Sequence, residues 1–150
     1  MPRSPRFWLP VVCFVAVASL GFVLRNQASL KQERKLQQEN RAAASLEFLR
    51  SVSSQEGFSS MDPMRQERIL TQAIQAHPEF AEFSVVTPQG RENVRMGRSL
   101  GPVPELRDFQ GQGWITETLV KGSYQEGTRL AVSIDGKKGV LLAELSSKGI

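Results

Sequence analysis

An uncharged stretch near the N-terminus limits what this chain can fold into more than any other feature. Residues 7–24 read FWLPVVCFVAVASLGFVL, eighteen residues without a charged side chain, between Arg6 and Arg25. Because an α-helix rises about 1.5 Å per residue, this stretch would be about 27 Å long, close to the thickness of a bilayer's hydrocarbon core. It therefore predicts a single transmembrane helix over 7–24, preceded by a cytoplasmic tail over 1–6.

A cleaved signal peptide is the alternative for the same residues. Arg3 and Arg6 form a basic start, and the sequence AVA at 16–18 resembles the small-residue motif that precedes a cleavage site. The apolar stretch continues past this motif to Leu24, which favours an uncleaved anchor.

The charges around the stretch bear on the orientation of the chain. Arg3 and Arg6 precede it, whereas a larger basic group follows it, formed by Arg25, Lys31, Arg34, Lys35 and Arg41. A literal positive-inside count places the C-terminal domain in the cytoplasm. However, Glu33 and Glu39 interrupt the basic group, and large C-terminal domains translocate largely regardless of flanking charge.

Residues 25–55 are predicted to form a stalk helix. From residue 26 to 55 there is no Gly or Pro, and most residues are good helix formers. Leu36, Asn40 and Ala43 have the spacing of a short parallel coiled-coil seam, which permits a homodimer. An exposed stalk with charge pairs four residues apart is the alternative, because apolar seam positions are sparse.

The remaining residues, 56–150, predict one α+β domain. Asp62 and Pro63 mark the start of a short helix that should end near Ala76, before the His77-Pro78 step. Alternating apolar residues then predict five antiparallel strands, at 83–87, 92–96, 114–120, 129–134 and 140–145, joined by Gly-rich and Pro-rich turns. The expected fold is therefore a long helix and a short helix on a five-stranded antiparallel sheet.

The sequence offers little chemistry for an enzyme. His77 is the single histidine and Cys13 the single cysteine, so no Cys/His metal site forms. No phosphate-binding glycine motif is present, and the carboxylates at 108, 117 and 135 have no reason to converge. The net charge of +4 is spread along the chain without an aromatic-basic signature. We therefore expect no enzymatic activity, no cofactor, no metal and no nucleic-acid partner.

The domain resembles a known family. The helix end IQAHPEF at 74–80, the hairpin FSVVTPQGRE at 83–92 and the later strands up to Leu145 are similar to PAS-like Cache (PDC) sensor domains. This resemblance implies an extracytoplasmic ligand-sensing module of a bacterial signal-transduction protein, held in the cytoplasmic membrane by one span. In that family a second membrane helix and an output domain follow. Here the sequence reads as a truncated receptor, or as a free-standing sensor that acts through a partner signalling protein.

The resemblance also implies where a ligand would bind. It would lie over the sheet, enclosed by the loop at 97–113 and the later strands, among Arg95, Arg98, Trp114, Thr116, Tyr124, Arg129 and Ser133. Because guanidinium groups bind carboxylates, a small anionic metabolite is the expected ligand. Core packing of the tryptophan and solvated arginines are the alternative. The corresponding alternative function is a membrane-anchored interaction or scaffold protein that uses its stalk helix and binds no small molecule.

Overall fold

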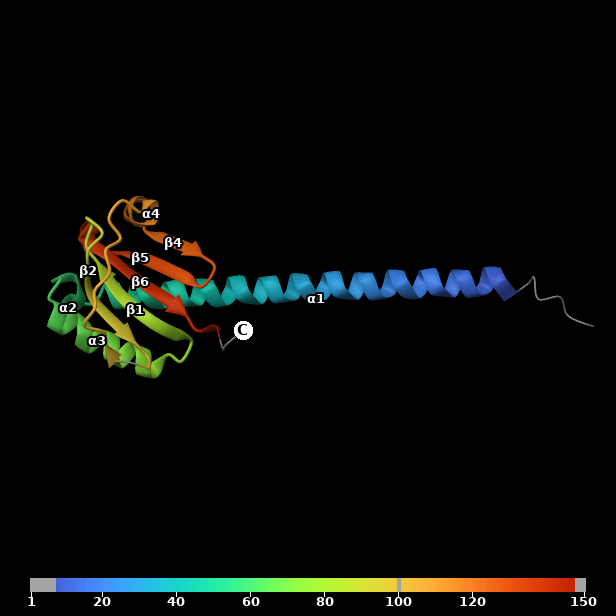
Figure 1. Ribbon diagram of the computed structural model, residues 1–150, viewed down its shortest axis with the longest axis horizontal. Coiled ribbons are helices and arrows are strands. Elements are labelled where there is room, and N and C mark those ends of the chain that lie inside the picture. Colours follow the sequence, from blue (N-terminus) through green and yellow to red (C-terminus); the bar gives the residue numbers. More distant parts are fainter. Residues whose placement is uncertain (1–7, 100, 148–150) are drawn as a thin grey trace, which may run out of the picture. The chain divides into compact units, whose positions relative to one another are not determined.

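The computed structural model describes residues 8–99 and 101–147, with side chains from residue 14 onward (Figure 1). The predicted cytoplasmic tail at 1–6, residue 7 and the side chains of 8–13 lie outside this description. Helix α1, Trp8–Ser53, runs without interruption through the residues predicted as transmembrane and stalk segments. Among the residues whose side chains are described, 14–99 and 101–147, no helix has both the length and the apolar character needed to cross a membrane.

The chain divides into two compact units, Met1–Arg41 and Ala42–Ile150. The described part of the first unit is helical, and its side chains from residue 14 to 41 are exposed. The second unit starts with the last turns of α1, in which Ala42, Leu49 and Val52 are buried at helical spacing. The second unit therefore includes the end of the predicted stalk as part of its own core.

Two short helices follow in the second unit. Helix α2, Glu56–Ser59, lies within the Ser-rich connection. Helix α3, Pro63–Ala76, begins as predicted, because the Asp62 carboxylate accepts a hydrogen bond from the backbone N–H of Met64 at 3.1 Å and Pro63 is the first helical residue. It ends at Ala76, where the following X-Pro step disfavours helix. The predicted bounds of this helix are confirmed.

The sheet has six antiparallel strands rather than the five predicted. The strands are β1 Phe80–Val86, β2 Glu92–Gly97, β3 Gly101–Pro102, β4 Ser123–Glu126, β5 Arg129–Ile134 and β6 Gly139–Leu145, in the spatial order β3-β2-β1-β6-β5-β4. The β1–β2 hairpin and the two last strands are confirmed. The edge strands β3 and β4 were not predicted, because both are short and lie in segments that read as turns.

The predicted strand at 114–120 is wrong, because these residues form helix α4, Gly113–Lys121. The β-branched residues of WITETLV favour a strand by propensity alone. Trp114, Ile115 and Thr118 are buried on one face of the helix, and packing on the sheet overrides that propensity. Gly122 then ends the helix in the left-handed conformation, with φ of 87°.

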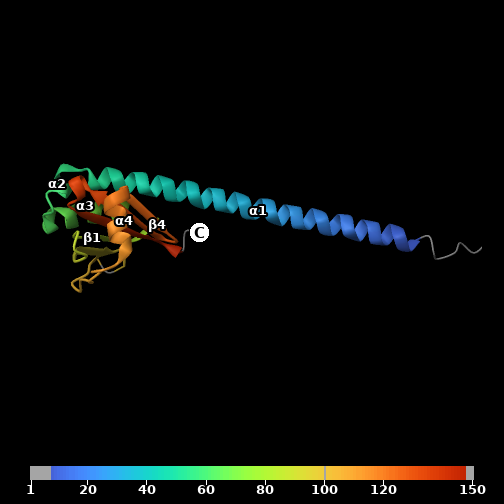
Figure 2. The same cartoon turned by 90° about the horizontal axis from the view of Figure 1, so that it is seen from above.

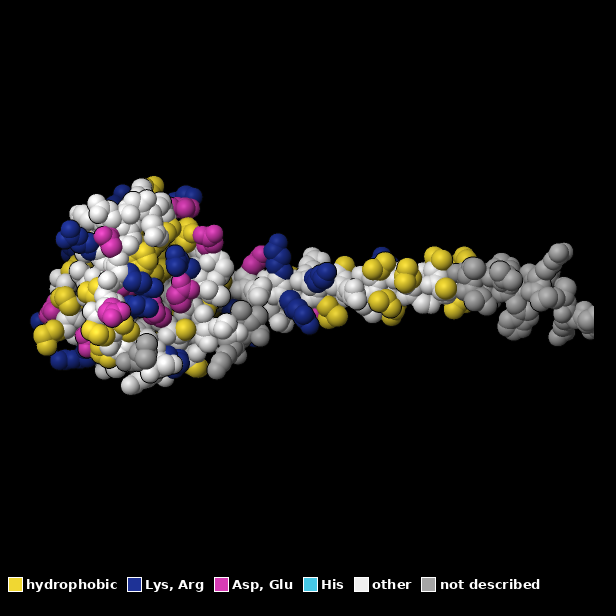
Figure 3. Space-filling view, viewed as in Figure 1, with side chains coloured by type: hydrophobic (Ala, Val, Ile, Leu, Met, Phe, Trp, Pro, Cys, Tyr) yellow, Lys and Arg dark blue, Asp and Glu magenta, His cyan; other side chains and the backbone are white. Residues whose placement is uncertain are grey.

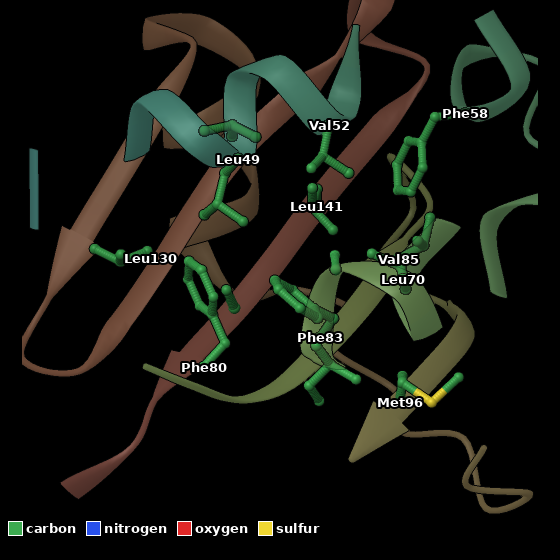
Figure 4. Packing of buried hydrophobic residues seen from close by; sticks show 14 of the residues in the cluster. Leu49, Val52, Phe58, Leu70, Phe80, Phe83, Val85, Met96, Leu130 and Leu141 are labelled. Carbon is green, nitrogen blue, oxygen red and sulfur yellow. The ribbon is translucent and has the colours of Figure 1, made fainter. Parts of the chain in front are cut away.

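The sheet has two covered faces. The end of α1, α2 and α3 cover the first face, where Leu49, Phe58 and Leu70 pack against Phe80, Phe83 and their neighbours (Figure 4). Helix α4 contacts β4, β5 and β6, and Figures 1 and 2 show it beside β4. On that second face Val86, Phe109, Trp114, Ile115 and Leu142 form a smaller apolar cluster. The second face is the one on which the resemblance places a ligand.

Candidate functional site

Polar residues of two neighbouring strands meet on the second face of the sheet. In β1, Glu82 and Ser84 alternate with Phe83 and Val85, which are buried in the core of the first face. In β2, Arg95 lies directly opposite Ser84. A register shift between residues 85 and 86 brings Glu92 of β2 opposite the end of β1. Together with Arg107 from the following loop, Glu82, Ser84, Glu92 and Arg95 form what we call the charged cluster.

Arg107 is the centre of the charged cluster. Its Nη2 donates to Glu82 Oε1 at 2.5 Å, to Glu92 Oε1 at 2.9 Å and to Ser84 Oγ at 3.0 Å. Its backbone N–H donates to Glu92 Oε2 at 2.7 Å. The Glu92 side chain has no exposed surface, whereas that of Arg107 is 32% exposed. One arginine therefore compensates a fully buried carboxylate.

The surroundings of Glu92 and Arg107 keep both side chains charged. Burial alone would raise the pKa of Glu92, but hydrogen bonds from Arg107 and Ser84 and the nearby guanidinium charge outweigh it, so the pKa lies below its ordinary 4.5. Burial alone would lower the pKa of Arg107, and its bonds to Glu92 and Glu82 raise it above the ordinary value. Glu92 and Arg107 are therefore both charged at neutral pH.

Residues 103–112, which we call the cover segment, lie along the outer edge of β2. The backbone N–H of Val103 donates to the Arg95 carbonyl at 2.9 Å, and that of Glu92 donates to the Arg107 carbonyl at 3.2 Å. The N–H of Phe109 donates to the Gly90 carbonyl at 2.7 Å in the β1–β2 turn. Gly90 has φ of 93°, and a Cβ there would lie 2.7 Å from the backbone of the cover segment.

An aromatic cluster covers the other half of the second face. The ring centroids of Phe109 and Trp114 are 5.4 Å apart, and those of Trp114 and Tyr124 are 6.2 Å apart. The Arg129 guanidinium lies 5.7 Å from the Trp114 ring centroid and pairs with Glu144 at 2.9 Å. A hydrogen bond to Glu126 raises the pKa of Tyr124. Phe109, Trp114 and Tyr124 pack in one apolar cluster with Ala131 of β5 and Leu142 of β6.

The structure separates the seven predicted site residues into different places. Trp114, Tyr124 and Arg129 meet in the aromatic cluster, and Arg95 belongs to the charged cluster. Thr116 is exposed on α4, and Ser133 is half-buried on β5.

Arg98, the remaining predicted residue, lies at the end of helix α3. Its guanidinium donates to the carbonyls of Phe80 at 2.9 Å and His77 at 2.6 Å, and also to that of Ile74. These carbonyls include two at the C-terminus of α3, where intrahelical partners are lacking. Arg98 therefore joins the end of α3 to the start of β1.

Sequence reasoning missed Glu82, Glu92, Arg107 and Phe109. The alternation along β1 contained the signal for Glu82, because polar residues at 82 and 84 lie between buried Phe83 and Val85. Nothing in the sequence pattern indicated Arg107, since it lies in an irregular segment fifteen residues from Glu92.

An open groove of about 240 Å³ lies between α3, β2 and the cover segment. It is lined by Glu67, Asn93, Val94, Arg95, Pro102, Val103, Pro104 and Leu106. Arg95 Nη2 donates to Glu82 at 3.1 Å, but its buried Nε has no hydrogen-bond partner among the described residues. Figure 3 shows acidic, basic and apolar side chains gathered on one face of the domain. The side chains described, those of residues 14–99 and 101–147, include no group of carboxylate, His or Cys side chains able to hold a metal ion.

Comparisons with known proteins identify the fold. No protein-family model and no curated protein matches this chain. A domain of a protein from Vibrio parahaemolyticus assigned to the sensory box/GGDEF family superimposes with a TM-score of 0.56 and 10% identity, over 71% of this chain and 54% of that chain. The extracellular domain of a protein assigned as the histidine kinase vpHK1S-Z8 gives 0.60 and 12%, over 74% and 52%.

These two likenesses show the fold alone, because the identities are low. The chain spans about half the length of each of the two solved chains. One of the two similar structures is a domain of a protein assigned to the sensory box/GGDEF family and the other is an extracellular domain of a histidine kinase, and the described domain shares their fold.

Proposed function

We propose that this chain is a membrane-anchored sensory domain of a bacterial signalling protein, with the domain at 56–150 outside the cytoplasm. One observation supports a ligand site above the others. The groove beside β2 is lined both by Arg95, whose buried Nε–H has no hydrogen-bond partner in the described part of the chain, and by Val103, Pro104 and Leu106 of the cover segment. A molecule bound there would contact the cover segment directly, so its arrival would be coupled to the position of that segment.

The proposed ligand is a small anionic metabolite. An unpaired guanidinium donor favours a carboxylate, and the groove volume suits a molecule of few atoms. Within the charged cluster, Glu82 pairs with both Arg95 and Arg107, and Glu92 pairs with Arg107. A ligand carboxylate would therefore compete with Glu82 for Arg95. This competition would weaken the interactions between the charged cluster and the cover segment, to which Arg107 belongs.

Thermal unfolding of the full chain in a mild detergent tests the ligand site. A panel of small mono-, di- and tricarboxylates should include at least one that raises the unfolding temperature of the wild type. Arg95→Gln should abolish the rise. Arg91→Gln, an exposed position in the same hairpin, is the matched control and should retain it. An equal rise in Arg95→Gln would place the ligand elsewhere, and no rise with any carboxylate would contradict an anionic ligand.

The proposed anchor is the segment at 7–24. Its described side chains are unusually exposed for apolar residues, including Phe14 at 80%, Val17 at 72% and Phe22 at 68%. Exposed apolar surface on this scale is covered by lipid or by another protein. Protease treatment of intact cells tests the anchor and its orientation together. Digestion of residues after Arg25 without lysis is expected, whereas digestion only after lysis would place the domain inside the cell.

A second function is favoured by the packing of the aromatic cluster. Phe109, Trp114 and Ile115 are buried and fill the second face over β5 and β6, where a sensory ligand was expected from the sequence. A protein that uses its stalk for interaction and binds no small molecule would have such a filled face. Under this alternative no carboxylate raises the unfolding temperature, while a site-specific cross-linker in the stalk captures the same membrane partner in intact cells.

A further inference from the structure

A group of basic side chains follows the proposed anchor on α1. Arg25, Lys31, Arg34 and Lys35 are all exposed, and none of them forms an ion pair within the described residues. Residues 25–39 hold these four basic side chains and the two acidic ones of Glu33 and Glu39, a net charge of +2. We call the four basic residues the basic collar.

The spacing of the basic collar places it near a membrane surface. Lys31, Arg34 and Lys35 are separated by three and four residues, so they share one face of the helix. Arg25 directly follows the apolar segment, and Lys31 lies about 9 Å farther along the helix axis. Each headgroup layer of a bilayer is roughly 5–7 Å thick. Lys31 therefore begins just beyond that layer, and its long flexible side chain can reach back into it.

The remaining two residues lie within range of the surface charge. Arg34 and Lys35 are about 14 and 15 Å past Arg25 along the helix. Beyond the headgroup layer, the potential of anionic lipids decays over a screening length of about 8 Å at physiological ionic strength. All four positive charges thus fall inside the zone where basic residues next to a membrane segment attract anionic headgroups.

We propose that the basic collar is a binding surface for the phosphate groups of anionic lipids. The lipids belong to the leaflet on the domain side of the anchor, and the collar would hold the first turns of the stalk against that leaflet. The inference rests on the proposed membrane anchoring at 7–24, because only the anchor brings the collar to the bilayer surface. Charge complementarity and direct continuity with the exposed apolar segment support lipid as the occupant.

Lysine acylation of the full chain in lipid nanodiscs, read by mass spectrometry, tests the proposal. One set of discs contains phosphatidylcholine alone, and the other contains equal parts of phosphatidylcholine and phosphatidylglycerol. Lys31 and Lys35 should react several-fold more slowly in the anionic discs, and molar salt should remove the difference. Lys137, which is exposed on the second compact unit, is the internal control and should react equally in both.

Variants sharpen the test. Arg25→Gln with Arg34→Gln should reduce the protection of the two lysines, whereas Arg65→Gln on α3 should leave it unchanged. Equal reaction of Lys31 and Lys35 in both discs would overturn the basic collar while leaving the anchor intact. Failure of the chain to co-purify with either disc would overturn the anchor as well. Protection of Lys31 and Lys35 that depends on protein concentration would identify a second copy of the chain as the occupant instead. Protection that depends on added RNA in detergent would identify nucleic acid.

Discussion

Arg107→Ala removes the guanidinium that compensates a fully buried carboxylate. Breaking a buried ion pair by deleting one partner costs about 3–5 kcal/mol when both groups are shielded from water. The Glu92 side chain has no exposed surface, but those of Arg107 and Glu82 are 32% and 20% exposed, so solvent screens part of the interaction. We therefore expect the free energy of unfolding to fall by about 2–3 kcal/mol at neutral pH.

The assay is denaturant unfolding of the full chain in detergent, followed by tryptophan fluorescence. Trp8→Phe in the background leaves Trp114 as the single reporter, and this residue packs against Phe109 of the cover segment. Arg129→Ala is the matched control. It also breaks an arginine–glutamate pair on the second face, but both of its side chains are about one-third exposed, so the expected loss is about 0.5–1 kcal/mol.

Acid pH provides a second readout for the same variant. The pKa of Glu92 is lower in the folded chain than its ordinary 4.5. Its contribution to stability is therefore complete above about pH 4.5 and is lost progressively as the pH falls from there through the folded pKa. The difference between the wild type and Arg107→Ala should narrow over this range. A loss no larger than that of Arg129→Ala, or one that does not change with acid pH, would refute the central role of Arg107.

Three further predictions concern a glycine next to the cover segment, the arginine at the end of α3 and the stalk helix. Gly90→Ala should lower the free energy of unfolding by about 1–3 kcal/mol, because the added Cβ would clash with the cover segment and the residue has a positive φ. Gly111→Ala adds a Cβ into open space and should lower the free energy of unfolding by less in the same assay. Arg98→Ala should lower the unfolding temperature, because it removes the hydrogen bonds from the guanidinium to the carbonyls of Phe80 and His77. An unchanged unfolding temperature would show that these hydrogen bonds do not stabilise the fold. In a variant whose own cysteine is removed by Cys13→Ser, the new cysteine of Asn40→Cys should form a disulfide-linked dimer in membranes if the stalk is a coiled coil. The same variant should remain monomeric if the stalk is not a coiled coil.

Elements with local signals were predictable from the sequence. Asp62 and Pro63 fix the start of α3, and the Pro78 step fixes its end, so both bounds follow from neighbouring residues. The hairpin of β1 and β2 and the pair β5 and β6 follow from alternating apolar residues. Helix α4 was missed because its β-branched residues favour a strand, and its helical state depends on packing against distant strands. Gly122 after Lys121 was the available local signal for a helix end.

The site was less predictable than the fold because its residues meet only in the tertiary structure. Arg95 was identified from residue type and predicted position, yet its partner Glu82 lies thirteen residues away on the neighbouring strand. Arg107 comes from an irregular segment whose path follows from backbone bonds to β2 and to the hairpin turn. The family resemblance placed Trp114 and Arg129 at one site over the sheet, and they meet there although Trp114 belongs to a helix and not to the predicted strand.

The order of strands in the sheet has a consequence for how the chain is made. Strand β6 follows the other strands in the sequence but lies between β1 and β5, so its residues pair with residues 54 to 65 positions earlier, from Val86↔Val140 to Phe80↔Leu145. During synthesis, one edge of β1 stays without its neighbour until β6 has emerged from the ribosome. Non-local pairing of this kind slows folding and leaves a strand edge open to wrong partners. Shortening the chain by even its last strand would remove a central strand of the sheet, and nascent chains halted before Gly139 should depend strongly on chaperones.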